Sequence, residues 1–373
     1  MKIRYLTLLT LIFLIPLTSC SMRKLTDVSV IAQEESVIPS ATLSPTKKNT
    51  PTNTPTPTVT PTKTVTPTFT STPWELDSFT SSLISPYAQP VTYIEDTCAY
   101  LENKWGEGKS TPGTIVVPIM FHSILKSDRE ATDPNQMTKA YFEYFMGYAQ
   151  KLGFETITTA ELVAFLEENE AIPERAMILI LDDRRPDTPE LFMPYLEANN
   201  WTLTLAWPTT EATSDRLWQK IEDYVDTGFV EVQPHGHYHI YIQDYTPVEE
   251  IETEIYQPIE VIQTHFGTAS SAFVWPGGNF TELAVEMARE AGYEIGFTAY
   301  SRGPLMFNWI PLGEIEMTAN DPLMVLPRFW STEAHLALDE AVAIGDAAKQ
   351  AAEEIKKEEL LYYSLYCQSG EGE

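Results

Sequence analysis

Strand-like and helix-like patterns alternate along residues 114–335. The strand-like segments are short apolar runs bounded by polar residues, a pattern typical of strands buried on both faces of a parallel sheet. The helix-like segments place apolar residues three or four positions apart, which gives a helix one apolar face. The expected strands are 115–122, 154–157, 176–183, 202–207, 230–236, 272–278, 294–300 and 324–330. The expected helices are 137–151, 158–168, 188–200, 214–224, 247–266 and 281–291.

This alternation predicts an α/β fold built on a parallel sheet. Seven or eight strand–helix units favour a (β/α) barrel, and an open doubly wound sheet is the alternative. In both arrangements ligands bind at the carboxyl ends of the strands. Polar residues at those ends are therefore the candidates for chemistry.

The first 20 residues carry the pattern of an export signal. Lys2 and Arg4 precede a mostly apolar run from Leu6 to Pro16, which is too short for a comfortable membrane span. The run ends in Leu17–Cys20, which resembles the lipobox of bacterial lipoproteins. An ordinary signal peptide with a chance cysteine is the alternative. We expect lipidation of the Cys20 thiol and a protein anchored to the outer face of the bacterial cell membrane.

Changes in composition divide the rest of the chain. From about Ser40 to Pro73 nearly every residue is Thr, Pro or Ser, which cannot bury a core and predicts a disordered stalk. A short helix is expected near 97–105, and an Ala- and Glu-rich helix from Thr332 to Glu354. The expected organisation is a lipoprotein signal peptide (1–20), a disordered linker (21–73), an N-terminal extension (74–113), a main domain (114–335) and a C-terminal helix and tail (336–373).

Charge and cysteine content narrow the functional classes. The 373-residue chain has 53 acidic and 24 basic residues and a formal net charge of -29. Nucleic acid is excluded as an expected partner, because phosphate binding needs a basic surface. A neutral or cationic substrate is compatible with this charge. Apart from Cys20, Cys98 and Cys367 are expected to be isolated buried thiols, with pairing in space as the alternative.

Two adjacent acids end one of the expected strands. The apolar run Ile178–Leu181 leads directly into Asp182 and Asp183. Neighbouring carboxylates repel each other, and a metal ion bound by one of them relieves that repulsion and leaves the other free as a base. A solvated acid pair that caps a helix is the alternative.

Histidines cluster at the end of another expected strand. His235, His237 and His239 are half of the six histidines in the chain. Imidazole is a common ligand of zinc-like metals, so the cluster indicates a metal site. A third strand end carries Pro276, Gly277 and Gly278, where glycine lets a ligand approach the backbone; a plain turn explains this segment equally well.

The order of these segments resembles the polysaccharide deacetylases, carbohydrate esterases that remove N-acetyl groups from glycans. Their Thr-Phe-Asp-Asp-Gly motif corresponds to Ile180–Arg184, their His-Ser/Thr-x-x-His motif to His235–His239, and their Arg-x-Pro-x-Gly motif to Val274–Gly278. The poly-N-acetylglucosamine deacetylase branch also opens with Tyr-His-Ser, which corresponds to Phe121–Ser123. The resemblance covers roughly 115–330.

The resemblance implies an irregular (β/α) barrel at 114–335 that hydrolyses N-acetyl groups of a surface or extracellular N-acetylglucosamine polysaccharide. Asp183, His235 and His239 would bind a divalent metal, with zinc expected first and cobalt, nickel and iron as alternatives. Asp182 would be the general base. His237 ranks below its neighbours as a ligand, but would replace one of them if the backbone curled differently. Substrate-binding positions would be Trp275, Pro276, Gly277, Gly278, Arg184 and Arg328.

A general acid is needed as well, because an amide anion is a poor leaving group. His265 lies near the end of a long helix and His335 in the first turn of the tail helix, which makes both poor candidates. His122 ends the first strand on the same face as Asp182, so we expect it to be the acid. A histidine that only hydrogen-bonds a loop is the alternative.

Three departures from the family pattern favour other functions. Arg184 replaces a glycine, Val274 replaces the usual arginine, and the C-terminal Leu-His motif is not evident. Arg184 is expected to lower the pKa values of the acids or to fill the cleft, and Arg328 to supply the missing cation. The alternatives are a catalytically impaired glycan-binding lipoprotein on a deacetylase scaffold, or a metal-binding exported lipoprotein with no glycan role.

Overall fold

The computed structural model describes residues 79–126, 129–210 and 212–368. All of them lie in one compact unit, Ser71–Glu373. The expected signal peptide, the lipidation site Cys20 and the linker lie outside the described residues. In the described part of the chain, no helix combines the length and the apolarity that a membrane span requires.

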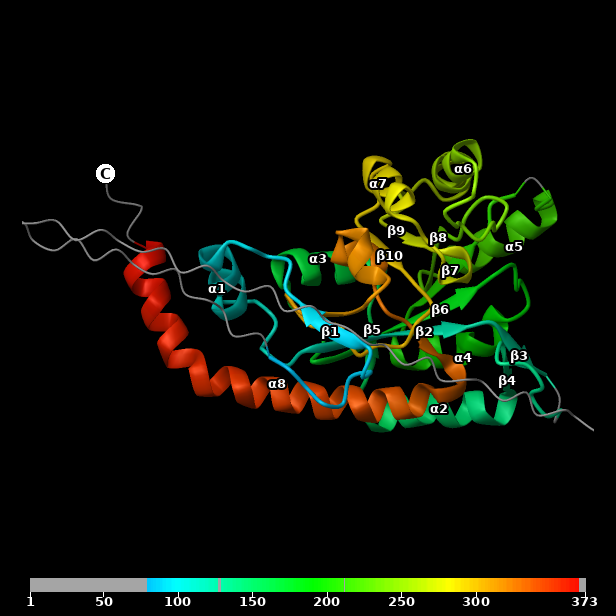
Figure 1. Ribbon diagram of the computed structural model, residues 1–373. Helices are drawn as coiled ribbons and strands as arrows, with labels where there is room; N and C mark the ends of the chain where they lie inside the picture. The colour runs from blue at the N-terminus through cyan, green and yellow to red at the C-terminus, as the bar shows by residue number, and fades with distance from the viewer. Residues whose placement is uncertain (1–78, 127–128, 211, 369–373) are drawn as a thin grey trace, which may run out of the picture. The chain divides into compact units, whose positions relative to one another are not determined.

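Parallel strands form the centre of the molecule (Figure 1). β2 and β6 pair over their whole length, from Ile115 opposite Arg175 to Phe121 opposite Leu181. The main sheet has the order β12-β2-β6-β7-β8, with β5 on β6, and β9 pairs with β10. The bounds are β2 (Ile115–Phe121), β5 (Glu155–Thr156), β6 (Arg175–Asp182), β7 (Leu203–Trp207), β8 (Val230–Pro234), β9 (Ala272–Val274), β10 (Ile295–Phe297) and β12 (Phe329–Trp330).

Two further connections bring the strands into an irregular barrel. Leu326 N donates to Gly296 O at 2.7 Å, which joins β10 to the segment that enters β12. Between β8 and β9 side chains make the link: Ala272 N donates to Gln233 Oε1 at 3.2 Å, and His235 Nδ1 donates to Val274 O at 2.7 Å. The expected barrel is confirmed, and its irregularity lies partly at this seam.

Helices cover the barrel, and several begin at side-chain caps. Thr158 accepts from Glu161 N while the Glu161 side chain accepts from Thr158 N, which is a capping box. Thr138 and Thr281 cap two other helices. The bounds are α1 (Thr97–Trp105), α2 (Lys139–Lys151), α3 (Thr159–Glu168), α4 (Pro189–Asn199), α5 (Asp215–Val225), α6 (Val248–Phe266), α7 (Glu282–Glu290) and α8 (Ala334–Tyr362).

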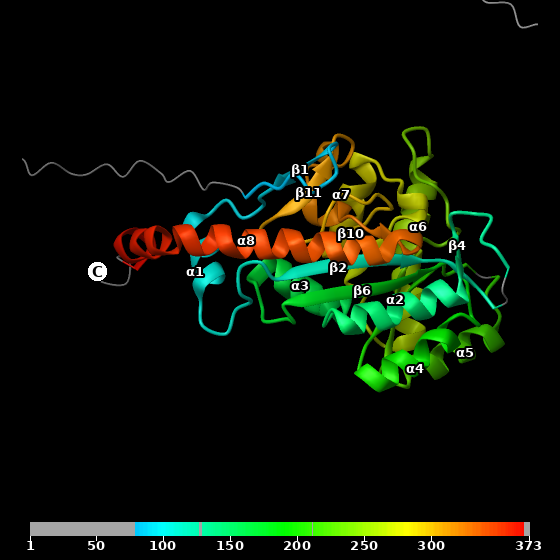
Figure 2. The ribbon, with the colours of Figure 1, turned by 90° about the horizontal axis from the view of Figure 1, so that it is seen from below.

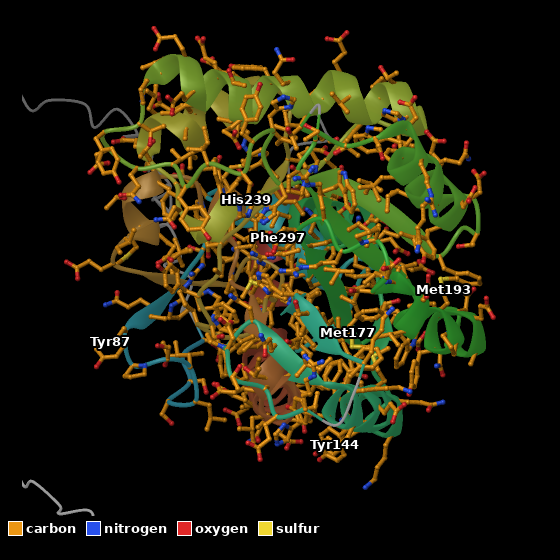
Figure 3. The ribbon with its side chains drawn as sticks, turned by 90° about the vertical axis from the view of Figure 1, so that its right-hand side faces the viewer. Tyr87, Tyr144, Met177, Met193, His239 and Phe297 are labelled. Atoms are coloured by element: carbon orange, nitrogen blue, oxygen red, sulfur yellow. A yellow bond between two sulfur atoms is a disulfide. The ribbon has the colours of Figure 1, made fainter. Side chains whose placement is uncertain are left out.

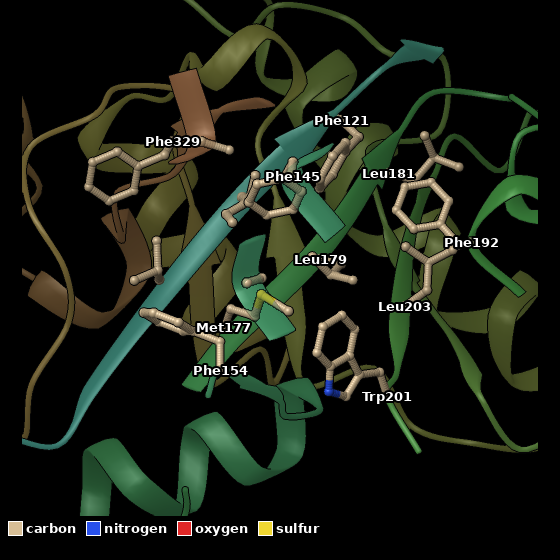
Figure 4. Packing of buried hydrophobic residues seen from close by; sticks show 14 of the residues in the cluster. Phe121, Phe145, Phe154, Met177, Leu179, Leu181, Phe192, Trp201, Leu203 and Phe329 are labelled. Atoms are coloured by element: carbon tan, nitrogen blue, oxygen red, sulfur yellow. The ribbon is translucent and has the colours of Figure 1, made fainter. Parts of the chain in front are cut away.

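The strand β6 separates two apolar clusters. Met177, Leu179 and Leu181 pack in one cluster (Figure 4), whereas Ile178 and Ile180 pack in the other. Alternate residues of a strand point to opposite faces, so Asp182 continues the face of Ile178 and Ile180. The acid therefore extends from a buried apolar face at the carboxyl end of the strand.

Several expected strands are shorter in the structure because proline and glycine interrupt them. The strand expected at 272–278 ends at Val274, since Pro276–Gly278 form a 3-10 turn with φ of 63° at Gly277. The strand expected at 324–330 is a 3-10 helix, Pro322–Val325, followed by the two-residue β12. Strands not expected from the sequence are β1 (Ala88–Val91), β3 (Ser123–Leu125), β4 (Gln136–Thr138) and β11 (Ile310–Gly313).

The expectation of two isolated thiols is wrong, because Cys98 and Cys367 form a disulfide. The bond joins α1 to the segment that follows α8 (Figures 1 and 2). Nearby, Lys104 Nζ and Trp105 Nε1 donate to the carboxylate of Glu359 at 2.8 and 2.7 Å. Residues at the two ends of the described chain therefore stabilise each other, as β1 also does by pairing with β11.

Candidate metal centre and active site

Asp182 is buried where β6 ends, and three basic side chains surround it. Arg328 Nη1 donates to its Oδ1 at 2.6 Å. His122 Nε2 and His235 Nε2 lie 3.8 and 3.7 Å from its Oδ2. Burial alone would raise the pKa of Asp182, but Arg328 and the two imidazoles outweigh it and hold that pKa below its usual value. The carboxylate is thus ionised and available as a proton acceptor.

Asp183, His235 and His239 bring one potential ligand atom each to a common point. These three atoms lie within 4.8 Å of one another. His239 Nε2 is 3.3 Å from Asp183 Oδ1 and 3.1 Å from His235 Nε2. Figure 3 views the molecule from the right-hand side of Figure 1 and labels His239. The arrangement matches the sequence-based ligand set.

The chemistry of this set fits a divalent transition metal. His235 Nδ1 donates to Val274 O, so its Nε2 carries the lone pair that a metal needs. Burial lowers the pKa of His235 to about 4, which keeps the imidazole neutral near pH 7. Two imidazoles and one carboxylate form a common three-residue ligand set that leaves coordination positions open.

His237 lies outside the ligand group. Its side chain is buried, and its Nδ1 lies 3.0 Å from Thr209 Oγ1. The backbone explains the difference, because Gly236 and His239 both have positive φ, 74° and 65°. The segment is therefore curled, and the first and last histidines of the cluster converge.

A residue that the sequence analysis missed holds this curled loop. Glu254, on α6, accepts hydrogen bonds from the backbone N–H groups of His237, Tyr238, His239 and Ile240 at 2.7–3.2 Å. A sequence signal existed: Glu254 lies on the apolar stripe of α6 beside Ile251 and Ile255, where an acid is unusual.

His122 lies beside Asp182, on the face where the sequence analysis expected it. Its ring stacks on Trp330 with centroids 5.8 Å apart, and its Nε2 faces Asp182. Burial lowers the pKa of His122 from its ordinary value, against the opposing effect of Asp182. The imidazole is therefore neutral near pH 7.

The three arginines near the acid pair have different neighbours. Arg184 is exposed and makes no ion pair within the described residues, and the pKa of Asp182 is lowered by Arg328 and the two imidazoles instead. Asp183 has a φ of 69°, and beyond this turn Arg185 is the residue whose Nη2 donates to Asp183 Oδ2 at 3.0 Å. Arg328 is fully buried against Asp182, the position expected for the missing cation.

The third motif, Val274–Gly278, has its indole in the core of the molecule and a tight backbone turn at its end. Trp275 is fully buried, and its Nε1 donates to Met324 O at 2.8 Å, so its side chain does not face a substrate. Gly277 lies close against the Tyr241 ring, since a Cβ there would lie 2.9 Å from Tyr241 Cζ. Pro276 and Gly278 are buried within the same turn.

A cavity of about 270 Å³ lies elsewhere, lined by residues that include Phe79, Tyr100, Asn169 and Trp309. Its lining includes Thr114 and Asn169, which precede β2 and β6, so it lies toward the amino ends of these strands. None of the residues of the metal centre lines it.

A comparison with protein families tests the resemblance to the polysaccharide deacetylases. Residues 169–296 match the family model described as polysaccharide deacetylase. Residues 169–296 form a polysaccharide deacetylase domain. The matched region contains Asp182, Asp183 and the histidine cluster, so the family motifs and the metal centre coincide.

Two curated proteins with the same type of domain are similar to this chain. The poly-beta-1,6-N-acetyl-D-glucosamine N-deacetylase of Escherichia coli K12 is 24% identical over 236 residues, which are 51% of this chain and 34% of that protein. Its counterpart from strain O157:H7 is 23% identical over the same shares. The chain thus spans about a third of the length of these relatives.

A solved structure supports the fold. The Streptococcus pyogenes deacetylase PplD in complex with acetate matches with a TM-score of 0.52 and 18% identity, over 62% of this chain and 99% of that one. At this identity the match establishes the barrel architecture.

Proposed function

We propose that this protein, through its polysaccharide deacetylase domain, hydrolyses N-acetyl groups of an N-acetylglucosamine-containing polysaccharide with the help of a divalent metal. One observation carries the proposal: Asp183, His235 and His239 converge beside the buried, ionised Asp182. The names of the Escherichia coli relatives support the substrate class. Zinc is the proposed metal, because two imidazoles and a carboxylate suit it.

A metal held by Asp183, His235 and His239 would supply Lewis acidity to the reaction. The chain's own residues would handle the protons. Asp182 Oδ2 accepts a proton from the attacking water while the new carbon–oxygen bond forms at the acetamide carbonyl. Arg328 keeps Asp182 oriented through its bond to Oδ1.

The leaving nitrogen then needs a proton before the carbon–nitrogen bond breaks. His122 is neutral at rest, so it first takes the proton from Asp182 and then donates it to the nitrogen. Water and amide are thereby converted to acetate and a free amine, and Asp182 returns to its ionised form. The 3.8 Å between His122 Nε2 and Asp182 Oδ2 places the two residues near enough for this transfer after a small shift.

The catalytically impaired alternative loses its main argument, because Arg328 supplies the cation that Val274 cannot. The sequence alone supports two further parts of the proposal. The protein is exported, and lipidated Cys20 anchors it to the outer face of the bacterial cell membrane. The anchor would keep the enzyme near a cell-surface glycan.

Acetate release from N-acetylglucosamine oligomers tests the function. The purified chain is assayed as prepared, after chelation, and after zinc is restored, with Asp182→Asn as the matched control. We expect acetate only from the zinc-loaded native chain. A zinc-loaded native chain that binds oligomers but releases no acetate would instead support a glycan-binding role.

A further inference from the structure

Glu254 is a buried carboxylate with an unusual set of partners. Its residue is 0% exposed, and it lies among the apolar residues of α6. Burying a charged carboxylate is costly unless hydrogen bonds compensate it. Here four backbone N–H groups of the histidine loop supply that compensation: one to Oε1, from Tyr238, and three to Oε2, from His237, His239 and Ile240.

The loop in turn depends on Glu254, which accepts hydrogen bonds from its backbone N–H groups. After β8 ends at Pro234, the curled backbone of residues 236–240 belongs to no strand or helix. Its N–H groups are part-buried or buried and would be unpaired without an acceptor, which costs free energy for each group. One side chain therefore satisfies four consecutive donors.

Gly236 makes the close approach possible. A Cβ at this position would collide with Glu254 Oε2, and its φ of 74° also favours glycine. His239 adopts a φ of 65°, a conformation that costs free energy for a residue other than glycine. The bond from His239 N to Glu254 Oε2 helps to hold that conformation.

The conformation of the loop sets the direction in which the His239 side chain points. His235 is fixed by Val274 O, whereas His239 is partly exposed and has its side chain directed by the curled loop. We propose that Glu254 is a positioning residue of the metal centre, which holds residues 237–240 in the conformation that aims His239 Nε2 at His235 Nε2 and Asp183. This inference rests on the proposed metal site.

Replacing Glu254 with glutamine or alanine should weaken zinc binding to different extents. The Glu254→Gln variant would keep one oxygen, which can accept the three bonds now made to Oε2, but its NH₂ group would face the Tyr238 N–H. The Glu254→Ala variant would remove all four of these hydrogen bonds. Changes of this kind around a metal site weaken metal binding by about 10–100-fold. We expect Glu254→Gln to weaken zinc binding by about tenfold and Glu254→Ala by about a hundredfold.

The test is zinc affinity of the metal-stripped full chain, measured by competition with a chelating indicator. Glu252→Gln is the matched control, because Glu252 is exposed on the same helix and loses the same charge. Its zinc affinity should stay within about twofold of the native value. Thermal unfolding of each metal-free variant checks that it is folded, and Glu254→Gln carries the test if Glu254→Ala does not fold.

Two further measurements separate positioning from general stability. The visible spectrum of the cobalt-loaded chain reports ligand geometry and should change in Glu254→Gln but not in Glu252→Gln. Hydrogen exchange at the amides of residues 237–240 should accelerate in Glu254→Gln only. An effect on unfolding temperature alone, with native zinc affinity and cobalt spectrum, overturns the inference.

The outcomes distinguish this inference from the proposed function. A native chain that binds zinc no more tightly than the Glu254→Gln variant leaves the metal site standing and overturns the role of Glu254. A native chain that binds no zinc overturns the metal site, and the positioning role with it. Zinc binding that weakens in Glu254→Gln while Glu252→Gln matches the native chain supports the inference.

Discussion

Asp182 combines burial with charge in a way that few side chains tolerate. One oxygen accepts from Arg328, and the other faces two imidazoles, so each part of the carboxylate has a partner. Its neighbour Asp183 turns away with a positive φ and faces His239 instead. A single backbone turn thus gives two adjacent acids different neighbours.

The ligand set makes the first prediction. Replacing His235 and His239 together with Ala should abolish metal binding, because only the Asp183 carboxylate of the described ligand group remains. Elemental analysis of the purified double variant, beside His237→Ala as control, measures this. Unchanged metal content in the double variant would show that the ion binds elsewhere.

The second prediction concerns His122. The His122→Ala variant should keep its metal, since this residue is not in the ligand group, and should deacetylate about 10²-fold more slowly, the usual contribution of a proton-transfer residue. Acetate release and metal content are measured on the same sample. Native-rate deacetylation by this variant would assign the proton transfer to another group.

Substitutions at Arg328 and Arg184 should affect kcat to very different extents. Arg328→Lys keeps the charge but cannot make both of the present bonds, to Asp182 Oδ1 and from Nε to Thr298 O, so kcat should fall by about 10-fold or more. Arg184→Gly should change kcat by less than about twofold, because Arg184 is exposed and has no ion pair within the described residues. Steady-state kinetics on both variants tests the assignment, and the reverse order of effects would refute it.

Among the elements, the barrel strands were the easiest to predict and the turns between them the hardest. Apolar runs such as Ile178–Leu181 exclude most alternatives to a buried strand, and polar residues mark where these runs end. Pro276 lies within one expected strand and ends it early, and Pro322 begins the 3-10 helix that replaces the first residues of another. The antiparallel pairing of β1 with β11 joins segments that are far apart in the sequence, and no local sequence pattern predicts such a pairing.

The candidate site was predicted where its residues follow strands directly. The ligands and Asp182 are of this kind, whereas Glu254 acts from a helix and Arg185 from a turn. Their roles depend on distances between segments, which periodicity does not contain. The pairing of Cys98 with Cys367, 269 residues apart, was missed for the same reason.

The disulfide gives a prediction for α1 and α8. Cys98→Ser should lower the free energy of unfolding by about 2–5 kcal/mol, because the bond closes a very long loop and restricts the unfolded chain. Denaturant unfolding of this variant and of the native chain measures the loss. The native chain in reductant should match Cys98→Ser, and a reductant with no effect would contradict the disulfide.

The whole molecule carries the last prediction, which rests on sequence outside the described residues. If Cys20 is lipidated, Cys20→Ser should release the protein from the membrane fraction while leaving its metal content and acetate release unchanged. Fractionation and mass spectrometry of the N-terminal fragment measure this. A Cys20→Ser protein that stays in the membrane fraction would show that another segment holds it there.

The Cys98–Cys367 bond also has a consequence for where and when the molecule is completed. Disulfides persist in oxidising compartments and are rare where glutathione and thioredoxin keep thiols reduced. This one joins residues separated by 269 positions, so it forms only once both cysteines are under oxidising conditions. In a reduced chain, α8 is held to α1 by noncovalent contacts such as Lys104 with Glu359. The redox state of the surroundings therefore determines whether α1 and the end of α8 are joined covalently.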